Sequence, residues 1–476
     1  MPDQSSLHAS DDRPAVNFRI TAMIVASAML MENIDATVLA TALPTMARDF
    51  GVDAPAMSIA LTSYLLSLAI FIPASGRIAD RYGSRSVFRA AIFVFIVGSV
   101  CCAIAPTLPA LVAARLLQGV GGAMMMPVGR LVLMRSVARK DMVSAISWLL
   151  IPALVGPILG PPIGGLIVTY LDWRWIFYIN VPIGLVGMIV VSIYIPEFRG
   201  AKITRFDWVG FVLSGISLGG LLFGFELASH EGEGLAAIGL ILGGTLFGAA
   251  YLRHARNHAA PIMDFSLMKV PSFGTSVIAG SLTRITQGAQ PFLLPLMFQI
   301  GFGYSAAFAG QMVIATAIGS LLMKPFARPV YRYLGFRVSL AINGILGTIG
   351  YGACAMFGPA WPNWLMFLVM ALGAFFMSFQ FTAYNTIAYD EIPPERMSSA
   401  TSFYTTIQQL MLSLGICIGA LALRASMVAG GNREPQLADF SMAFIVVTLI
   451  SITATIWNLR FHPRAGAEIS GHVSQR

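Results

Sequence analysis

Fourteen apolar runs, each about the length that crosses a bilayer, follow one another along this chain. A spanning helix needs roughly 20 mostly apolar residues. Short polar breaks separate the runs, and the widest breaks lie near 197–207, 253–272 and 424–439. Because backbone groups in hydrocarbon must be paired within the segment, each run is predicted to be a helix. The predicted spans are 20–43, 55–76, 88–106, 109–130, 142–170, 174–196, 208–228, 235–252, 273–299, 304–327, 338–357, 363–387, 398–423 and 440–459.

The composition excludes a soluble enzyme that merely carries an anchor. Charged residues make up 11% of the chain and hydrophobic residues 57%, whereas soluble domains carry about 25% charged residues. Residues 1–18 are polar and do not resemble a signal peptide, so the first apolar run is predicted to stay as a span. The absence of a Gly-rich loop ending in Gly-Lys-Ser or Gly-Lys-Thr argues against an ATP site. No disulfide framework and no metal cluster are expected, because every cysteine lies in an apolar run: Cys101, Cys102, Cys354 and Cys417.

The basic residues predict the orientation in the membrane. If the N-terminus is cytoplasmic, 24 of the 30 Lys and Arg residues fall in inner loops and tails, four fall in outer loops and two lie within spans. This asymmetry follows the positive-inside rule and supports the fourteen-span count. Both termini are then cytoplasmic. The net charge of +8 is interpreted as an orientation signal and a contact with anionic lipid, not as a nucleic-acid footprint.

An internal repeat divides the chain into two halves. The segment 76–89 follows the second span, and a weaker echo at 328–337 follows the tenth, with Gly335 aligned on Gly83. Repeats of this kind are typical of secondary transporters. We therefore expect an all-α membrane protein with a six-helix bundle in 1–200, two extra transmembrane helices in 201–262 and a second six-helix bundle in 263–476.

The fifth predicted span contains an unusual number of glycines and prolines. Glycine lets a neighbouring backbone approach closely, and proline bends the helix. A bent helix with a groove along one face is expected in a transporter, where it would control the side of the membrane to which the cavity opens. The residues concerned are Gly156, Pro157, Gly160, Pro161, Gly164 and Gly165.

A few charged residues lie within predicted spans, where they are costly and point to function. The acids are Glu32, Asp35 and Glu226, and every histidine is predicted to lie in a loop or tail. A proton carrier should therefore be a carboxylate, and Glu32 and Asp35 share one helix face because they are three residues apart. Glu32 is also expected to line the substrate cavity, where protonation of either acid would compete with substrate binding. Glu226 lies near the outer end of its span, so we expect it to reach toward water without a functional role.

Two arginines lie within predicted spans. Arg115 is about 9 Å and Asp35 about 13 Å from the outer ends of their helices, which suggests a pair. That pair is either a permanent salt bridge or one that opens when Asp35 is protonated. Arg284 in the ninth span either faces a cavity or caps backbone carbonyls.

Four further residues within spans either face the cavity or join helices by hydrogen bonds: Gln287, Gln380, Tyr384 and Gln408.

Several motifs together resemble one family, the major facilitator superfamily, and specifically its fourteen-span drug:proton antiporter branch of the multidrug efflux type. They are Asp35-Ala-Thr37, the 76–85 loop, the Arg115 to Gly122 segment, the Gly/Pro motif of the fifth span, and the Trp173 to Pro182 stretch. The resemblance implies two six-helix bundles plus two additional helices. It ties Arg115 to proton coupling and the Gly/Pro motif to antiport. It implies a conformational latch made of Gly76, Asp80, Arg81, Gly83 and Arg85, although Asp80 can also be read as an ordinary turn residue.

The expected function is proton-coupled secondary transport that exports small amphipathic compounds by alternating access. An importer or symporter of the same fold is one alternative, and a non-transporting membrane sensor or scaffold is another. We expect no enzymatic activity, no bound metal and no cofactor, with protons as the coupling ion. The protein is expected to be a monomer in a bacterial inner (plasma) membrane that binds a small-molecule substrate and no nucleic acid. Outer-membrane efflux partners are left open.

Overall fold

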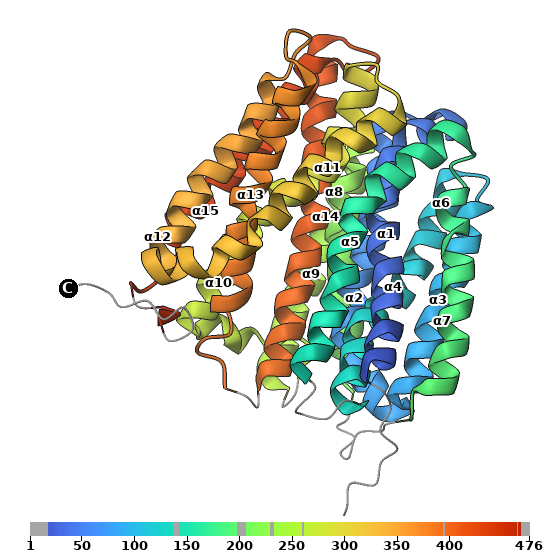
Figure 1. Cartoon of the computed structure of the whole chain (residues 1–476), viewed down its shortest axis with the longest axis vertical. Coiled ribbons are helices and arrows are strands. Elements are labelled where there is room, and N and C mark those ends of the chain that lie inside the picture. The colour runs from blue at the N-terminus through green and yellow to red at the C-terminus, as the bar shows by residue number, and fades with distance from the viewer. Residues whose placement is uncertain are drawn as a thin grey trace, which may run out of the picture.

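The structure is a computed structural model that describes residues 18–136, 142–197, 206–228, 233–258, 261–393, 396–463 and 465–467. These residues form helices, with no strand among them (Figure 1). In chain order the elements are α1 (Phe18–Phe50), η1 (Ala54–Met57), α2 (Ser58–Tyr82), α3 (Ser84–Ala103), α4 (Leu108–Ser136), α5 (Met142–Tyr170), α6 (Trp175–Tyr178), α7 (Asn180–Tyr194), α8 (Trp208–Leu227), α9 (Gly234–Asn257), η3 (Phe265–Lys269), α10 (Pro271–Leu296), η4 (Met297–Gly301), α11 (Ala306–Leu322), α12 (Lys324–Gly352), η5 (Ala353–Met356), α13 (Asn363–Ile387), α14 (Met397–Gly430) and α15 (Leu437–Asn458).

Fourteen of these helices are long, from 15 residues in α7 upward, and each coincides with one predicted apolar run. The all-helical fold class is therefore confirmed. By length and composition, eleven helices in the described residues can cross a membrane, and α11 and the described part of α5 are shorter apolar helices. Helix α10 lies outside both groups. It carries Thr283, Arg284, Thr286, Gln287 and Gln290 within its length, a polar content that suits a helix facing a cavity.

The helices alternate between two ends of the molecule (Figure 1). We call the end that holds the α2–α3 turn at Gly83 the basic end, and the end that holds η1 the opposite end. Helices α1 to α7 pack mainly on one another and form the first bundle, and α10 to α15 form the second. The two bundles meet where α5 packs on α11 and where α2 packs on α14. Helices α8 and α9 pack on each other, and α8 also contacts α2 and α14.

The internal repeat appears in the backbone at two equivalent turns. Gly83 between α2 and α3 has φ 93°, and Gly335 has φ 71°, a left-handed region that glycine enters without steric penalty. The alignment of these two glycines is thus matched by their conformation. The expectation that 328–337 is a loop was wrong. Helix α12 begins at Lys324, before this segment, and continues through it with a kink at Gly335.

Hydrogen bonds fasten the segment between α9 and α10 to α9 itself and to the start of α14. Tyr251 of α9 donates its hydroxyl to the Met263 carbonyl at 3.0 Å and accepts from the Met263 amide at 2.8 Å. Asp264 accepts from Arg396 at 2.7 Å, at the start of α14. Burial raises the pKa of the Asp264 carboxyl, but hydrogen bonds from Ser266 and Arg396 outweigh burial and hold this pKa below its ordinary value.

Candidate functional site

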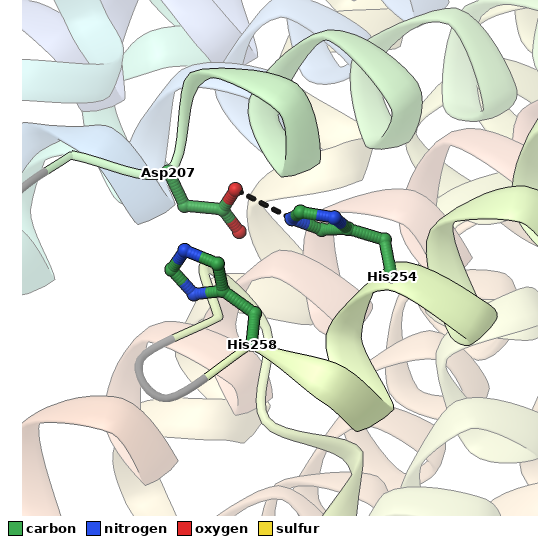
Figure 2. A group of neighbouring side chains, drawn as sticks. All are labelled: Asp207, His254 and His258. Carbon is green, nitrogen blue, oxygen red and sulfur yellow. Dashed lines mark hydrogen bonds and ion pairs between the residues drawn. The ribbon is translucent and has the colours of Figure 1, made fainter.

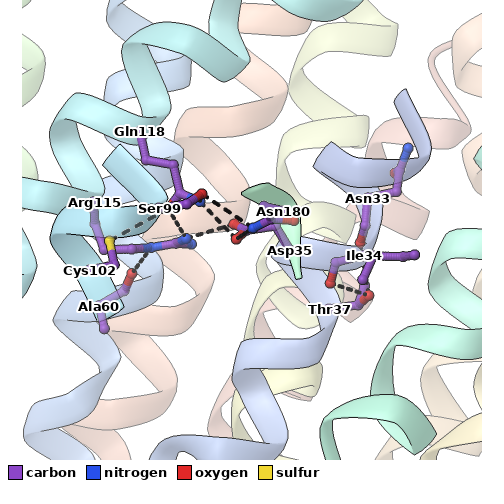
Figure 3. Close-up of polar contacts among 10 residues, drawn as sticks. All are labelled: Asn33, Ile34, Asp35, Thr37, Ala60, Ser99, Cys102, Arg115, Gln118 and Asn180. Carbon is purple, nitrogen blue, oxygen red and sulfur yellow. Dashed lines mark hydrogen bonds and ion pairs between the residues drawn. The ribbon is translucent and has the colours of Figure 1, made fainter. Parts of the chain in front are cut away.

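A buried polar network joins α1, α3, α4 and α7 inside the first bundle (Figure 3). Asp35 Oδ2 accepts from Arg115 at 2.7 Å, and Asp35 Oδ1 accepts from Gln118 at 2.8 Å and Asn180 at 2.9 Å. Ser99 Oγ accepts from Gln118 at 2.8 Å and from Asn180 at 3.3 Å. The pair predicted from the matching depths of Asp35 and Arg115 is confirmed as a contact. Helices α3 and α7, together with Gln118 of α4 itself, supply the polar groups that hold it.

Arg115 is held on several sides at once. Its Nε donates to the Ala60 carbonyl at 3.0 Å, and its NH1 also donates to Gln118 Oε1 at 2.6 Å. Its guanidinium lies 4.4 Å from the centre of the Tyr64 ring, a cation–π distance. Arg115 is 0% and Asp35 1% exposed. Removing one partner of such a buried pair typically costs about 3–5 kcal/mol, because an uncompensated charge remains. Neutralising Asp35 would therefore perturb every member of the network.

Glu32 lies about one helical turn from Asp35, toward the basic end, in a different environment. It is 8% exposed, and its Oε2 is buried without a hydrogen-bond partner among the described residues. An ionised carboxylate that is buried without full hydrogen bonding is costly, and a bound proton removes the charge. Glu32 could therefore take up a proton without breaking an ion pair, whereas a proton on Asp35 would have to release Arg115.

The glycines of the Gly/Pro motif line a close contact between α5 and α1. A Cβ placed on Gly160 would lie 1.9 Å from Thr37 Oγ1, and one on Gly164 would lie 2.4 Å from Thr41 Oγ1. Gly156 lies one turn earlier on the same face, where a Cβ would be 2.6 Å from the nearest α1 side chain. Spacing by four residues keeps these glycines on one stripe of the helix. The stripe lets α5 approach α1 more closely than any other side chains would allow.

A second side of the same motif faces the other bundle. A Cβ on Gly165 would lie 2.3 Å from the Ala306 carbonyl oxygen of α11, and one on Gly310 of α11 would lie 2.3 Å from the Pro161 carbonyl oxygen. The predicted groove is therefore a contact between bundles as well as within one. Pro157 belongs to α5, but its side chain lies outside the described residues.

Polar contacts also join the two bundles toward the opposite end. They link the η1 region, α1 and α5 of the first bundle with η4, α11 and α14 of the second. The contacts are Gln299 Nε2 to the Thr41 carbonyl at 2.9 Å, the Ala307 amide to Thr169 Oγ1 at 3.0 Å, and Arg424 with Asp53 at 3.6 Å. Together with the glycine contacts, they close the bundles on each other at this end.

A cavity of about 350 Å³ lies between the bundles. Its wall includes Thr37 and Thr41 of α1, Gln287 and Gln290 of α10, and Lys324 at the basic end, and the rest is mostly apolar. The structure thus places the predicted cavity residue Gln287 on the wall, and it adds Lys324, which the sequence indicated only as an orientation signal. Helix α1 supplies both this wall and the two acids, although Glu32 itself is not one of the wall residues.

Arg284 contacts the cavity indirectly. It is 6% exposed, and its guanidinium lies 4.5 Å from the centre of the Phe381 ring. Phe381 is one of the wall residues. The side chain of Arg284 therefore supports the wall through a cation–π contact.

Three other residues predicted for the cavity join helices of the second bundle instead. They do not appear on the cavity wall, because each side chain is directed at a neighbouring helix. Tyr384 donates to Asn458 at 2.6 Å, Gln408 donates to Asn385 at 3.0 Å, and Gln380 packs with its amide 2.5 Å from where a Cβ on Gly344 would lie.

Part of the predicted latch is fixed to the first bundle. Glu197, just after α7, accepts from the Arg85 amide at 3.1 Å. The Arg85 side chain donates to the Ser192 carbonyl at 2.6 Å. A Cβ on Gly83 would lie 2.1 Å from Glu197 Oε1, so glycine is required here by space as well as by its positive φ. An acid beside the start of α3 is also favoured by the helix dipole.

The other part of the latch lies on the surface of the basic end. Gly76 is exposed, and a Cβ on it would meet no atom within 4 Å. Arg81 is exposed and Asp80 is half-buried in the last turn of α2. Gly76 and Arg81 are thus at the surface of the basic end, and Asp80 lies between them in the sequence.

The prediction that Glu226 reaches toward water was wrong. It is 2% exposed, at the end of α8. Its Oε1 accepts from Ser58 of α2, and its Oε2 accepts from Cys417 of α14 at 3.3 Å. Because α8 packs against both bundles, a side chain near its end meets a neighbour on either side before it meets solvent. Glu226 therefore bridges the first bundle and the second.

We expect Glu226→Ala to lower the stability of the protein, whereas Glu226→Gln keeps most of it. Hydrogen bonds to a charged group are worth about 1.5–3 kcal/mol each, and glutamine can still serve both partners. The ratio of protons to substrate moved should stay unchanged in Glu226→Gln, since Glu226 lies away from the α1 acids. Thermal unfolding in detergent and transport by both variants test this expectation. A Glu226→Gln protein that folds but moves substrate without protons would contradict it.

Sequence reasoning named Gln118 and Asn180 only as motif residues, and it missed Ser99 and Glu197. Asn180 is a polar residue in an otherwise apolar run, which was an available signal. Ser99 carried none, because a serine can satisfy its hydroxyl within its own helix.

Comparison with known proteins agrees with this architecture. The family model described as Major Facilitator Superfamily matches residues 25–416 and, in a second match, 277–472. The second match starts near the beginning of α10 and covers the second bundle. This agrees with the internal repeat.

The chain is also similar over its length to named relatives. It is 36% identical over 455 residues to "Putative multidrug resistance protein MdtD" of Escherichia coli O17:K52:H18 (strain UMN026 / ExPEC), which covers 93% of this chain and 95% of the relative. It is 36% identical over 406 residues to the protein of the same name from Serratia proteamaculans (strain 568), which covers 84% of each.

Solved structures share the fold at low identity. A D-xylose-proton symporter superimposes with a TM-score of 0.67 at 14% identity, over 93% of this chain and 97% of that one. An auto-inhibited POT family peptide transporter gives a TM-score of 0.68 at 15% identity over the same shares. The chain is thus a multi-pass membrane transporter, not an enzyme, and it belongs to the fourteen-span branch of the major facilitator superfamily.

Proposed function

We propose that the protein exports small amphipathic compounds in exchange for protons, by alternating access. One observation carries this proposal: α1 holds two buried acids and also forms part of the cavity wall. Glu32 and Asp35 lie on the same helix as Thr37 and Thr41. A change of charge at the acids can therefore act on the cavity through a single rigid element.

The glycine stripe of α5 connects α1 to the second bundle. It packs α5 against α1 and also against α11 of the second bundle. We propose that α1 and α5 shift together. With substrate bound and no proton on the α1 acids, the contacts at the opposite end would part and the basic end would close. A proton then taken up from the opposite side by Glu32 or Asp35 would return both helices to the arrangement seen here. The substrate and the proton would favour different arrangements of the same helices, which makes their movements opposed.

The cavity wall supports amphipathic substrates. Most of the wall is apolar, with amide groups from Gln287 and Gln290 and a cation at Lys324. Such a wall suits a compound with an apolar body and a hydrogen-bonding or anionic group. The name of the relatives from Escherichia coli and Serratia points the same way. We propose the inner membrane of a bacterium as the location, with the basic end cytoplasmic.

Export from cells tests the proposal. The chain would be expressed in bacteria that lack their main efflux pumps, and accumulation of a chemically broad panel of compounds would be measured. At least one amphipathic compound should accumulate less than in vector controls, and a protonophore should abolish the difference. If no compound responds, the sensor or scaffold alternative gains support. If one accumulates more, the importer alternative does.

We expect Asp80→Asn to express normally but to lose most transport. Asp80 is half-buried in the last turn of α2, next to the exposed Arg81. The carboxylate would be needed when the basic end closes, since it can then pair with the positive end of a second-bundle helix. Transport per folded molecule is the measurement, with Arg89→Gln, an exposed residue of α3 at the same end, as the control. A wild-type rate in Asp80→Asn would make Asp80 a turn residue.

A further inference from the structure

Three potential metal ligands meet at the basic end of the α8–α9 pair, away from the cavity. They are Asp207, just before α8, His254 in the last turn of α9 and His258 at its end. The expectation that every histidine lies in a loop or tail was wrong for His254, since α9 extends to Asn257. One ligand atom from each of the three lies within 4.8 Å of the other two. Figure 2 shows the carboxylate between the two imidazole rings.

The hydrogen bonds of Asp207 among the described residues involve only one of its two carboxylate oxygens. Its Oδ1 accepts from the Gly210 amide at 2.8 Å and contacts His254 Nε2 at 2.7 Å. Asp207 is 2% exposed, and its Oδ2 is buried without a hydrogen-bond partner among the described residues. A helix cap and an ion pair account for Oδ1 but not for Oδ2. A buried carboxylate oxygen normally has a partner, so this atom points to a missing one.

The histidines are arranged as ligands often are. His254 and His258 are four residues apart and therefore lie on one face of the helix end. Their rings are 5.1 Å apart between centroids, and both side chains are half-buried. We propose that Asp207, His254 and His258 bind a divalent transition-metal ion of the zinc class.

The chemistry of the set selects the class of ion. Two imidazoles and one carboxylate are a common ligand set for zinc, with a water in the fourth position. Magnesium and calcium prefer sets made of oxygen. Zinc bonds of about 2.0–2.2 Å in a tetrahedral site place ligand atoms about 3.4 Å apart. Atoms that now lie up to 4.8 Å apart would therefore have to approach by about 1.4 Å. Rotation of the half-buried histidines allows this without moving a helix.

The bound ion would join the beginning of α8 to the end of α9. These helices pack on each other, and α8 also contacts α2 and α14. The end of α9 is further tied to the chain before α10 through Tyr251 and Met263. The ion would therefore stabilise the pair where it connects to both bundles. This role does not depend on proton coupling or on the substrate.

Metal titration of the full-length protein tests the proposal. The protein is purified in detergent with an affinity tag that lacks histidine, stripped with a chelator, and titrated with Zn²⁺ by calorimetry. Co²⁺ is added in parallel, since its visible absorption reports tetrahedral ligands. We expect one saturable Zn²⁺ site per chain. Loss of outer-shell partners weakens metal binding by about 10–100-fold, so Asp207→Asn, His254→Gln and His258→Gln should each weaken it at least tenfold.

Two design features keep the result decisive. Asparagine caps helices as well as aspartate does, so Asp207→Asn should keep α8 intact, and His258→Gln alters a residue beyond the helix. His462→Gln, which removes one histidine elsewhere, serves as the matched control and should bind like wild type. The absence of saturable binding, or equal binding by wild type and the three site variants, would overturn the proposal. Loss in His462→Gln alone would relocate the site and also overturn it.

Discussion

Asp35→Asn is expected to abolish proton-driven substrate transport in a protein that still inserts and folds. The change keeps the shape of the side chain but removes its charge, so Arg115 loses the anion that lies 2.7 Å from it. Breaking a buried pair typically costs about 3–5 kcal/mol of stability. The cost should be smaller here, because the amide oxygen of asparagine can still accept a hydrogen bond from Arg115. Transport into proteoliposomes under an imposed pH gradient, compared with thermal unfolding of the same preparation, is the measurement.

A double variant separates coupling from structure. Asp35→Asn with Arg115→Gln removes both charges, and neutral replacements of buried pairs are often tolerated. If the pair serves only stability, the double variant should regain both stability and transport. If Asp35 takes part in coupling, stability should recover while transport stays absent. Glu32→Gln should also lose transport, but without loss of stability, because its Oε2 has no hydrogen-bond partner to lose among the described residues.

Gly160→Ala is expected to eliminate most transport and to destabilise the first bundle by about 1–3 kcal/mol, as overpacking typically does. The added carbon would lie 1.9 Å from Thr37 Oγ1 and 2.8 Å from Thr37 Cβ, so α1 and α5 must separate. Gly243→Ala makes the same chemical change in α9, another apolar helix. A Cβ on Gly243 would meet no atom within 4 Å.

The comparison of these two glycines is decisive because only the surroundings differ. Gly243→Ala should behave like wild type in thermal unfolding and transport. Adding Thr37→Ala to Gly160→Ala removes the nearest atom and should restore part of the stability. Wild-type stability and transport in Gly160→Ala would contradict tight packing between α1 and α5. An equal loss of stability and transport in Gly243→Ala would contradict it too.

The sequence predicted well how deep each residue lies in the membrane, but it predicted poorly which way each side chain points. Hydrophobic length fixed the positions of the spans, and counting residues from the helix ends brought Asp35 and Arg115 to one level. The face of each helix was harder, because a helix that is apolar all round gives no stripe to orient it. Glu226 shows this: its depth near the end of α8 was right, but its contacts with Ser58 and Cys417 depend on which way α8 is turned.

The same limit explains the cavity. Gln380 and Tyr384 lie on α13, whose polar residues were equally compatible with a cavity or with a neighbouring helix, and both contact neighbours. The Asp207 cluster needed a different kind of information. Asp207 and His254 are 47 residues apart, and only the packing of α8 on α9 brings them together.

Exchange of substrate and protons in proteoliposomes tests the central claim most directly. The protein would be reconstituted with a pH-sensitive dye in the lumen, and a compound found in the cell export assay would be added outside without an imposed gradient. The account predicts that substrate entry drives protons out, so the lumen becomes more alkaline, and that Glu32→Gln and Asp35→Asn eliminate this response. Substrate entry that acidifies the lumen, or that leaves its pH unchanged, would contradict proton-coupled export.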